Sequence, residues 1–113
     1  MEVLELAFQL LVAHAVLDFV LQPDVMAAAK NPQSKLHADG NREFPAWYYW
    51  MGSHSLGHGG AVYLITGSLW LGLIEVVLHA LIDYSKCSKR TSLAQDQALH
   101  LLCKVGYIVF LLL

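Results

Sequence analysis

The chain has 113 residues, of which 57% are apolar and 14% are charged, and its mean hydropathy is +0.49. Soluble domains carry about 25% charged residues, and a chain this short has too little interior to hide so much apolar surface from water. The net charge of −2 argues against nucleic acid as a partner, because nucleic-acid binding needs a basic face. We therefore expect a single domain with the lipid bilayer as its partner.

The first predicted element runs from about residue 3 to residue 22, which is long enough to cross a hydrocarbon layer about 30 Å thick. It has no basic leading region and no small-residue cleavage site, so we expect it to be retained. Pro23 ends this span, and Asp24 can cap a short interfacial helix over residues 25–30. A polar loop follows over residues 31–46. Its turn signals are Asn31-Pro32, Asp39-Gly40 and Phe44-Pro45.

Three further spans are predicted, over residues 47–66, 68–84 and 93–113. The second of the four spans begins with aromatic residues typical of a water–lipid boundary, and its glycines would let membrane helices approach closely. A short hinge at Gly67-Ser68 makes the second and third spans antiparallel neighbours. The predicted fold is an all-α, integral-membrane, antiparallel four-helix bundle with a short interfacial helix after the first span.

Basic residues gather on one side of this topology. Four crossings put the loops 23–46 and 85–92 on the same side of the membrane. Of the lysines and arginines, only Lys104 lies within a predicted span. The loops hold the other basic residues: Lys30, Lys35, Arg42, Lys86, Lys89 and Arg90. The positive-inside rule then predicts a multi-pass inner-membrane protein with both loops in the cytoplasm and both termini in the periplasm.

Each predicted span carries two metal-capable side chains four residues apart. Four residues are close to one helical turn, so the two members of a pair share a face of their helix. The pairs are His14/Asp18, His54/His58, His79/Asp83 and Asp96/His100. Counted from the cytoplasmic ends of the spans, all eight fall in one layer, where polar groups are costly. The sequence therefore predicts that these eight residues form a metal site inside the membrane.

The third and fourth spans extend this pattern into two aligned stripes. Packed antiparallel, the stripes pair Asp83 with Asp96, His79 with His100, and Glu75 with Lys104. The last pair predicts a salt bridge within the membrane. The first pair sets two carboxylates side by side, and a divalent metal between them would neutralise both.

The ligand set is imidazole and carboxylate without sulfur, because Cys87 and Cys103 lack the spacing of a thiolate site and are expected to be free. This set suits a divalent metal, with zinc as the first choice and manganese or iron as alternatives. Eight ligands exceed the need of one tetrahedral ion, so either two ions share the site or some residues orient the others. Gln22, in line with His14 and Asp18, is expected to orient a water or a substrate oxygen.

Three stretches of the chain are shared with a known family. They are His14-x3-Asp18-x3-Gln22 followed by Pro23-Asp24-x-Met26, His79-Ala-Leu-Ile-Asp83-Tyr84-x-Lys86, and Asp96-Gln97-x2-His100. Together they resemble short membrane proteins of bacteria and phages that are catalogued as domain of unknown function 3307. That family's pattern is distantly similar to membrane-bound metal-dependent hydrolases, so the resemblance implies hydrolysis without naming a substrate.

The leading hypothesis is a metal-dependent membrane hydrolase that acts on a lipid-linked phosphoester at the cytoplasmic headgroup layer. Asp18, Asp96 and Gln22 are its predicted catalytic residues. One alternative is a non-catalytic membrane module whose metal or polar network is structural and whose loops bind a partner. Another is conduction of protons or metal ions, which the nearly apolar outer halves of the spans disfavour. Four spans are few for a pore, though a homo-oligomer could supply one.

Overall fold

The computed structural model describes residues 1–38 and 43–113, and its regular elements there are all helical. The turn expected at Asp39-Gly40 and the loop charge expected at Arg42 lie outside the described residues. The long helices are α1 (Val3–Ala15), α3 (Trp47–Thr66), α4 (Leu69–Cys87) and α5 (Leu93–Leu112). The short elements are a π-helical turn η1 (Val16–Val20), α2 (Asp24–Ala29) and a 3-10 turn η2 (Lys35–His37).

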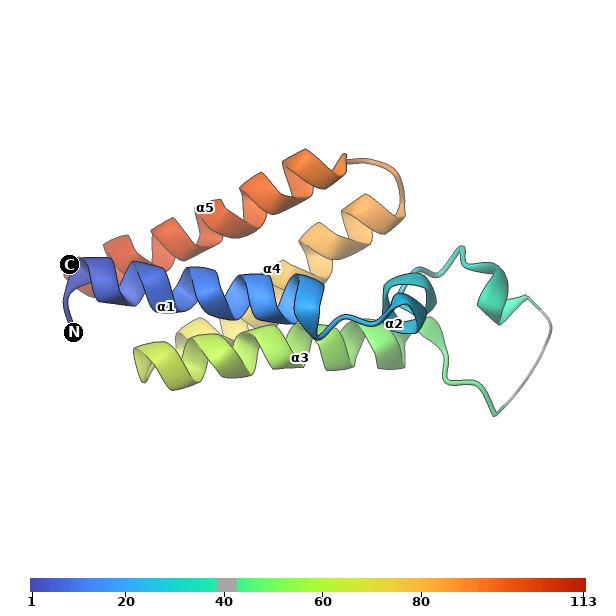
Figure 1. Cartoon of the computed structure of the whole chain (residues 1–113), viewed down its shortest axis with the longest axis horizontal. Helices are drawn as coiled ribbons and strands as arrows, with labels where there is room; N and C mark the ends of the chain where they lie inside the picture. The colour runs from blue at the N-terminus through green and yellow to red at the C-terminus, as the bar shows by residue number, and fades with distance from the viewer. Residues whose placement is uncertain (39–42) are drawn as a thin grey trace.

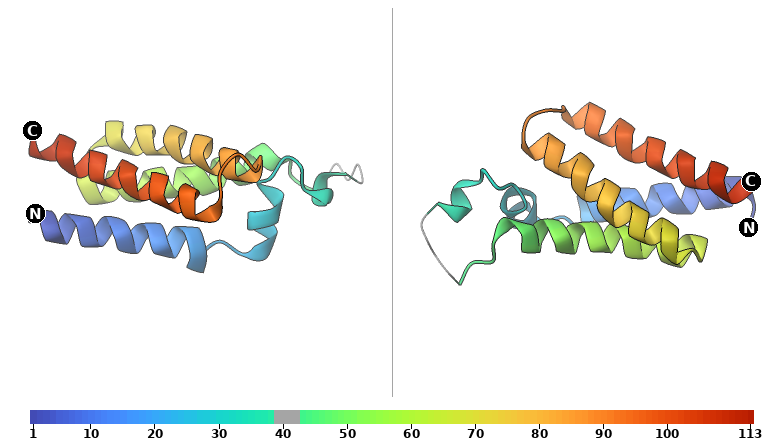
Figure 2. Two further views of the ribbon diagram at one scale, coloured as in Figure 1. Left: turned by 90° about the horizontal axis from the view of Figure 1, so that it is seen from above. Right: turned by 180° about the vertical axis from the view of Figure 1, so that it is seen from behind.

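The long helices run alternately in opposite directions and form an elongated bundle of 50 × 26 × 22 Å (Figure 1). Two further views place both termini at one end, with α2 and the segment that follows it at the other (Figure 2). The predicted all-α fold with four main helices and a short helix after the first is thereby confirmed. Asp24 is the first residue of α2 rather than the expected cap, because Pro23 takes the capping position.

The first predicted span changes helix type at its end. It is α-helical to Ala15 and then π-helical from Val16 to Val20, where the N–H of Leu21 donates to the carbonyl of Val16 at 2.7 Å. A π-turn holds one more residue per hydrogen-bonded ring than an α-turn and often occurs at functional sites. Asp18 lies in this turn, and its side chain is buried.

Helices α3 and α4 pack closely because glycines lie at their contact. A Cβ atom added to Gly59 would lie 2.6 Å from the carbonyl oxygen of Gly72, nearer than real Cβ contacts allow. The two helices are joined at Gly67, whose φ of 72° is in the left-handed region that glycine tolerates. The expected hairpin and the expected role of small residues are both confirmed.

The bundle has a largely polar interior, beside a small apolar cluster of Leu6, Leu10, Val62, Leu71 and Tyr107, and its surface is largely apolar. Its buried polar side chains are His14, Asp18, Lys30, His54, Ser55, His58, Glu75, His79, Asp83, Asp96, His100 and Lys104. Large apolar side chains face outward instead, such as Leu64 at 82% and Trp70 at 75% exposure. A soluble helical bundle has the reverse distribution, with apolar residues facing the core.

Among the described residues, one helix has the length and composition of a membrane span. It covers Val3–Val20, with a mean hydropathy of 1.8, and a membrane anchor or a signal sequence at the N-terminus would both fit it. The long helices match the predicted ranges 3–22, 47–66, 68–84 and 93–113 closely. Their polar inward faces lower the hydropathy of α3, α4 and α5, so composition alone does not mark these three as spans.

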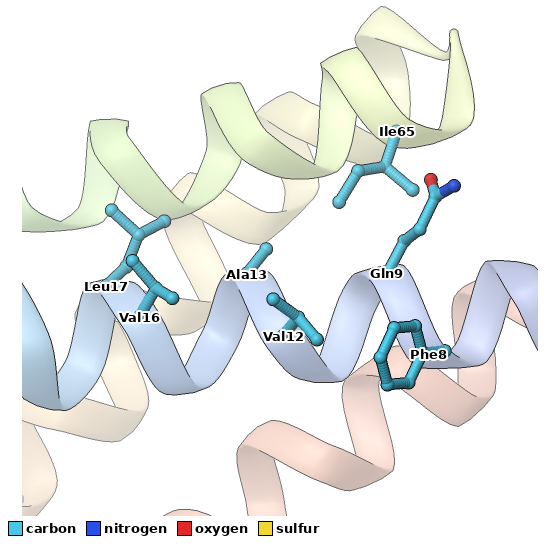
Figure 3. A pocket seen from close by; sticks show the side chains of 7 residues that line it. All are labelled: Phe8, Gln9, Val12, Ala13, Val16, Leu17 and Ile65. Carbon is cyan, nitrogen blue, oxygen red and sulfur yellow. The ribbon is translucent and has the colours of Figure 1, made fainter.

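An apolar groove lies on the outer surface between α1 and α3 (Figure 3). It is lined by side chains between Phe8 and Leu17 of the first helix and by Ile65 of α3, and its volume is about 460 Å³. Gln9 is the polar member of this lining. The groove therefore extends along the first helix as far as the residue that precedes Asp18.

Candidate metal centre

Asp18 lies at the centre of the buried polar cluster. Its Oδ1 atom is 3.0 Å from Nε2 of His54 and 3.0 Å from Nε2 of His58, both on α3. The same oxygen is 3.6 Å from Nε2 of His79 on α4. The π-helical turn and two long helices thus direct one oxygen and three nitrogens to a common point, and these side chains are at most 5% exposed.

The spacing of these four atoms suits a metal ion. A tetrahedral zinc ion with bonds of about 2.0–2.1 Å holds its ligand atoms about 3.3–3.4 Å apart. The distances from Asp18 Oδ1 lie on either side of that value, and all four atoms are within 4.8 Å of one another. The Nε2 atom of His79 has no hydrogen-bond partner in the described part of the chain. Buried polar atoms without partners cost about 1–3 kcal/mol each, a cost that a bound cation would remove.

A second group of ligand atoms adjoins the first. Asp18, Asp96 and His100 offer three atoms within 4.8 Å of one another. Oδ1 of Asp96 lies 3.5 Å from Nε2 of His100, and both side chains are fully buried. The His100 ring also stacks on His79, with ring centroids 4.2 Å apart. The predicted alignment of His79 with His100 is therefore confirmed.

His14 and Gln97 lie beside these groups. Nε2 of His14 is 2.8 Å from the amide oxygen of Gln97 and 3.6 Å from Oδ2 of Asp18. The Gln97 amide nitrogen donates to Oδ2 of Asp18 at 2.8 Å and to Oδ2 of Asp96 at 3.0 Å. His14, predicted as a direct ligand, thus contacts Asp18 both directly and through Gln97. Gln97 was not among the predicted site residues, although it directly follows Asp96 in the third shared stretch.

Two lysines engage Asp83, the remaining predicted ligand. Lys30 Nζ lies 2.5 Å from Oδ2 of Asp83, and Lys86 Nζ lies 3.1 Å from Oδ1. Lys86 is also 3.7 Å from Oδ2 of Asp96. Asp83 and Asp96 are therefore neighbours as predicted, with the Lys86 ammonium near both carboxylates. The metal predicted between them stays a prediction.

Lys86 remains positively charged in this position. Burial by itself lowers the pKa of its ammonium group, but the carboxylates of Asp83 and Asp96 outweigh burial and raise the pKa above its usual value. The protein thus neutralises Asp83 with its own cations. What remains for a metal is the part of the cluster around Asp18.

Lys30 and Gln22 close the end of the bundle where α2 is attached. Lys30 was expected at the end of the interfacial helix, among the basic residues of the cytoplasmic side, yet it is 2% exposed and donates to the amide oxygen of Gln22 at 2.5 Å. The amide nitrogen of Gln22 donates to the backbone carbonyl of Asp18 at 2.7 Å. These contacts secure the end of the π-helical turn, and the predicted role of Gln22 in orienting a water or substrate stays a prediction.

The predicted salt bridge between Glu75 and Lys104 is confirmed, at 2.5 Å. Tyr107 donates its hydroxyl to the other carboxylate oxygen of Glu75 at 2.5 Å. Glu75 Oε1 also lies 3.4 Å from Nδ1 of His79, so that Nε2 of the same ring is turned toward Asp18. A carboxylate on the far nitrogen of an imidazole fixes the orientation of a metal ligand.

The fold and the cluster define a class: a helical bundle with a buried histidine–carboxylate centre able to hold a metal ion. The chain belongs to the family described as "Protein of unknown function (DUF3307)", whose model matches residues 6–113. The resemblance drawn from the three shared stretches is thereby confirmed, without any link to hydrolases. Neither a curated protein nor a solved structure matches the chain.

Proposed function

We propose that this chain is an inner-membrane protein that holds a divalent metal ion between Asp18, His54, His58 and His79, and that the ion serves a hydrolytic reaction at the cytoplasmic headgroup layer. The proposal is carried by the convergence of Asp18 Oδ1 with three imidazole nitrogens at 3.0–3.6 Å. Imidazole and carboxylate ligands favour zinc, with manganese and iron as alternatives.

The polar interior and apolar surface support the membrane setting. In lipid, exposed side chains such as Trp70 and Leu64 need no protein cover, while buried charges such as Glu75 and Lys104 must be paired. We place all four long helices across the bilayer. The loops 23–46 and 85–92 then face the cytoplasm and both termini face the periplasm, because the loops carry the basic residues.

Hydrolysis needs an activated water and a group that takes up a proton. A bound divalent ion lowers the pKa of a water and polarises a phosphoryl oxygen. Asp18 serves as a ligand, because imidazoles and Gln97 surround its two oxygens. Oδ1 of Asp96 lies directly beside this group without a hydrogen-bond partner among the residues that the structure describes, and it can take up a proton or a cation.

A lipid-linked phosphoester is the substrate class that suits this setting. The groove between α1 and α3 supports it, because an apolar lining that includes Phe8 and Ile65 suits an acyl chain (Figure 3). The groove ends at Leu17, so a chain lying in it would bring its headgroup toward the depth of Asp18.

A structural metal in a non-catalytic module is the second candidate function. The burial of the ligands favours it, since His79 and His100 are 0% exposed and structural zinc sites are closed. The cytoplasmic loops would then serve to bind a partner. The two candidates share the ion and differ in whether a position on it is open.

Elemental analysis of detergent-purified protein tests the shared claim. We expect stoichiometric metal in the wild type and its loss in His79→Ala, with helix content unchanged by circular dichroism. His37→Ala is the matched control, because His37 lies outside the bundle and contacts the carbonyl of Ala29. A wild type without metal under non-chelating conditions would contradict both candidates.

Cobalt substitution separates the two candidates. An open position predicts that adding inorganic phosphate changes the visible absorption of the cobalt-loaded protein, because the anion enters the coordination sphere. A closed structural site predicts an unchanged spectrum. Release of phosphate from lipid-linked phosphoesters in mixed micelles would then identify the reaction directly.

A further inference from the structure

We propose that the cluster holds two metal ions and that Asp18 is the carboxylate they share. The first ion is the one already placed between Asp18 and the histidines of α3 and α4. The second is held by Asp18, Asp96 and His100, whose ligand atoms lie within 4.8 Å of one another. This inference rests on the proposed function, because the shared ligand is the one that carries the first site.

A carboxylate oxygen of Asp96 faces a ring nitrogen of His100. Oδ1 of Asp96 and Nε2 of His100 are 3.5 Å apart, close to the separation of about 3.3–3.4 Å between the ligands of a tetrahedral ion. Both side chains are 0% exposed, and neither atom has a hydrogen-bond partner among the described residues. A buried carboxylate oxygen that faces only an imidazole nitrogen is costly, and a cation between them satisfies both.

The other contacts of Asp96 leave this oxygen free. Gln97 donates to Oδ2 of Asp96 at 3.0 Å, and Lys86 lies 3.7 Å from the same Oδ2 atom. The Gln97 amide also holds Oδ2 of Asp18 at 2.8 Å. One amide group therefore fixes two carboxylates through their Oδ2 atoms, and their Oδ1 atoms are left to face the histidines.

The two sites are close enough to work as a pair. His79 of the first site stacks on His100 of the second, with ring centroids 4.2 Å apart, and Asp18 belongs to both. Paired metals in hydrolytic sites lie about 3.5–4 Å apart and stabilise the attacking and leaving oxygens of a displacement. Helical bundles hold such pairs with carboxylates and histidines that project inward. The pair would favour an anionic phosphoester as the substrate.

The test uses full-length protein loaded with manganese in detergent, with elemental analysis and electron paramagnetic resonance. We expect two ions per chain and a spectrum of magnetically coupled ions. Asp96→Asn and His100→Gln should each keep one ion, with the spectrum of an isolated ion. Asp24→Asn and His37→Gln are matched controls at positions outside the cluster, and they should keep two coupled ions.

The outcomes separate this inference from the proposed function. A folded wild type with one isolated ion overturns the second site and leaves the first in place. A wild type with no ion overturns both. The count and the coupling in the wild type decide the matter even if Asp96→Asn fails to fold, because neither depends on a variant.

Discussion

Asp18 reaches the centre of the cluster through a local departure from the α-helix. Its four-residue spacing from His14 predicted a shared inward face, and both side chains are buried. The π-helical turn was not predictable, because nothing in residues 16–20 distinguishes them from an ordinary apolar helix end. Gln22 donates to the carbonyl of Asp18, and the imidazoles of His54 and His58 contact its carboxylate. These partners of the turn come from separate parts of the chain.

Residue spacing along the chain does not predict which carboxylates are paired with lysines. Asp83 has the same four-residue relation to His79 as Asp18 has to His14, yet Lys30 and Lys86 pair with it. No pattern in the sequence marks Lys30 as buried, because its partner is 53 residues away. The positions of Lys30 and Lys86 thus determine that Asp83 is paired with lysine, while Asp18 is surrounded by histidines.

Glu75→Gln should weaken metal binding by roughly 10- to 100-fold, because the carboxylate that faces Nδ1 of His79 is replaced by a neutral amide. Competition with a chelator measures the affinity, and Glu75→Asp should restore part of it. Glu5→Gln is the matched control, since Glu5 is exposed on α1. An unchanged affinity in folded Glu75→Gln would mean that His79 needs no orienting partner.

At the scale of elements, the α3–α4 hairpin is the most predictable part of the fold. Alternating loops and apolar stretches predicted its helices, and the hinge with a left-handed Gly67 explains its tight return. The close backbone approach between Gly59 and Gly72 follows from the absence of side chains at the contact. Which of the glycines in α3 make that contact depends on the rotation of the helix about its axis, and spacing alone does not settle that rotation.

Gly59→Ala should destabilise the protein by about 1–3 kcal/mol, because its new methyl group would overlap Val76 and the carbonyl of Gly72. Gly60→Ala is the matched control, since nothing lies within 4 Å of an added Cβ there. Thermal unfolding in detergent followed by circular dichroism compares the two. Equal midpoints for both variants would show that α3 and α4 are not in contact at Gly59.

At the scale of the whole molecule, the proposed metal centre predicts that stability depends on a bound ion. A ligand that binds only the folded state adds about 4 kcal/mol of stability at a concentration 1,000 times its dissociation constant. Removing metal with a chelator should therefore lower the unfolding midpoint of the wild type and leave that of Asp18→Asn unchanged. Scanning calorimetry with and without chelator measures this, and an equal shift in both proteins would point to an effect unrelated to the centre.

The number of membrane crossings decides where the C-terminus lies. Four spans place both termini on the periplasmic side, whereas a chain anchored by residues 3–20 alone would place them on opposite sides. We expect tags on both ends of the protein to be accessible to protease in spheroplasts. A cysteine that replaces Gln33, in a variant without Cys87 and Cys103, should stay unlabelled by a membrane-impermeant maleimide. Termini found on opposite sides would exclude the four-span topology.

The sequence by itself determined the four helix ranges, the layer of histidines and carboxylates, and the alignment of His79 with His100 and of Glu75 with Lys104. Helical periodicity is a local property, so it can be counted along the chain. Only the tertiary structure decided that Asp18 contacts three histidines, that Gln97 holds it beside Asp96, and that Lys30 and Lys86 pair with Asp83. The reason is electrostatic: a buried charge is costly unless an oppositely charged or hydrogen-bonding group lies beside it. Here those groups come from other helices, so their pairing cannot be counted along the chain.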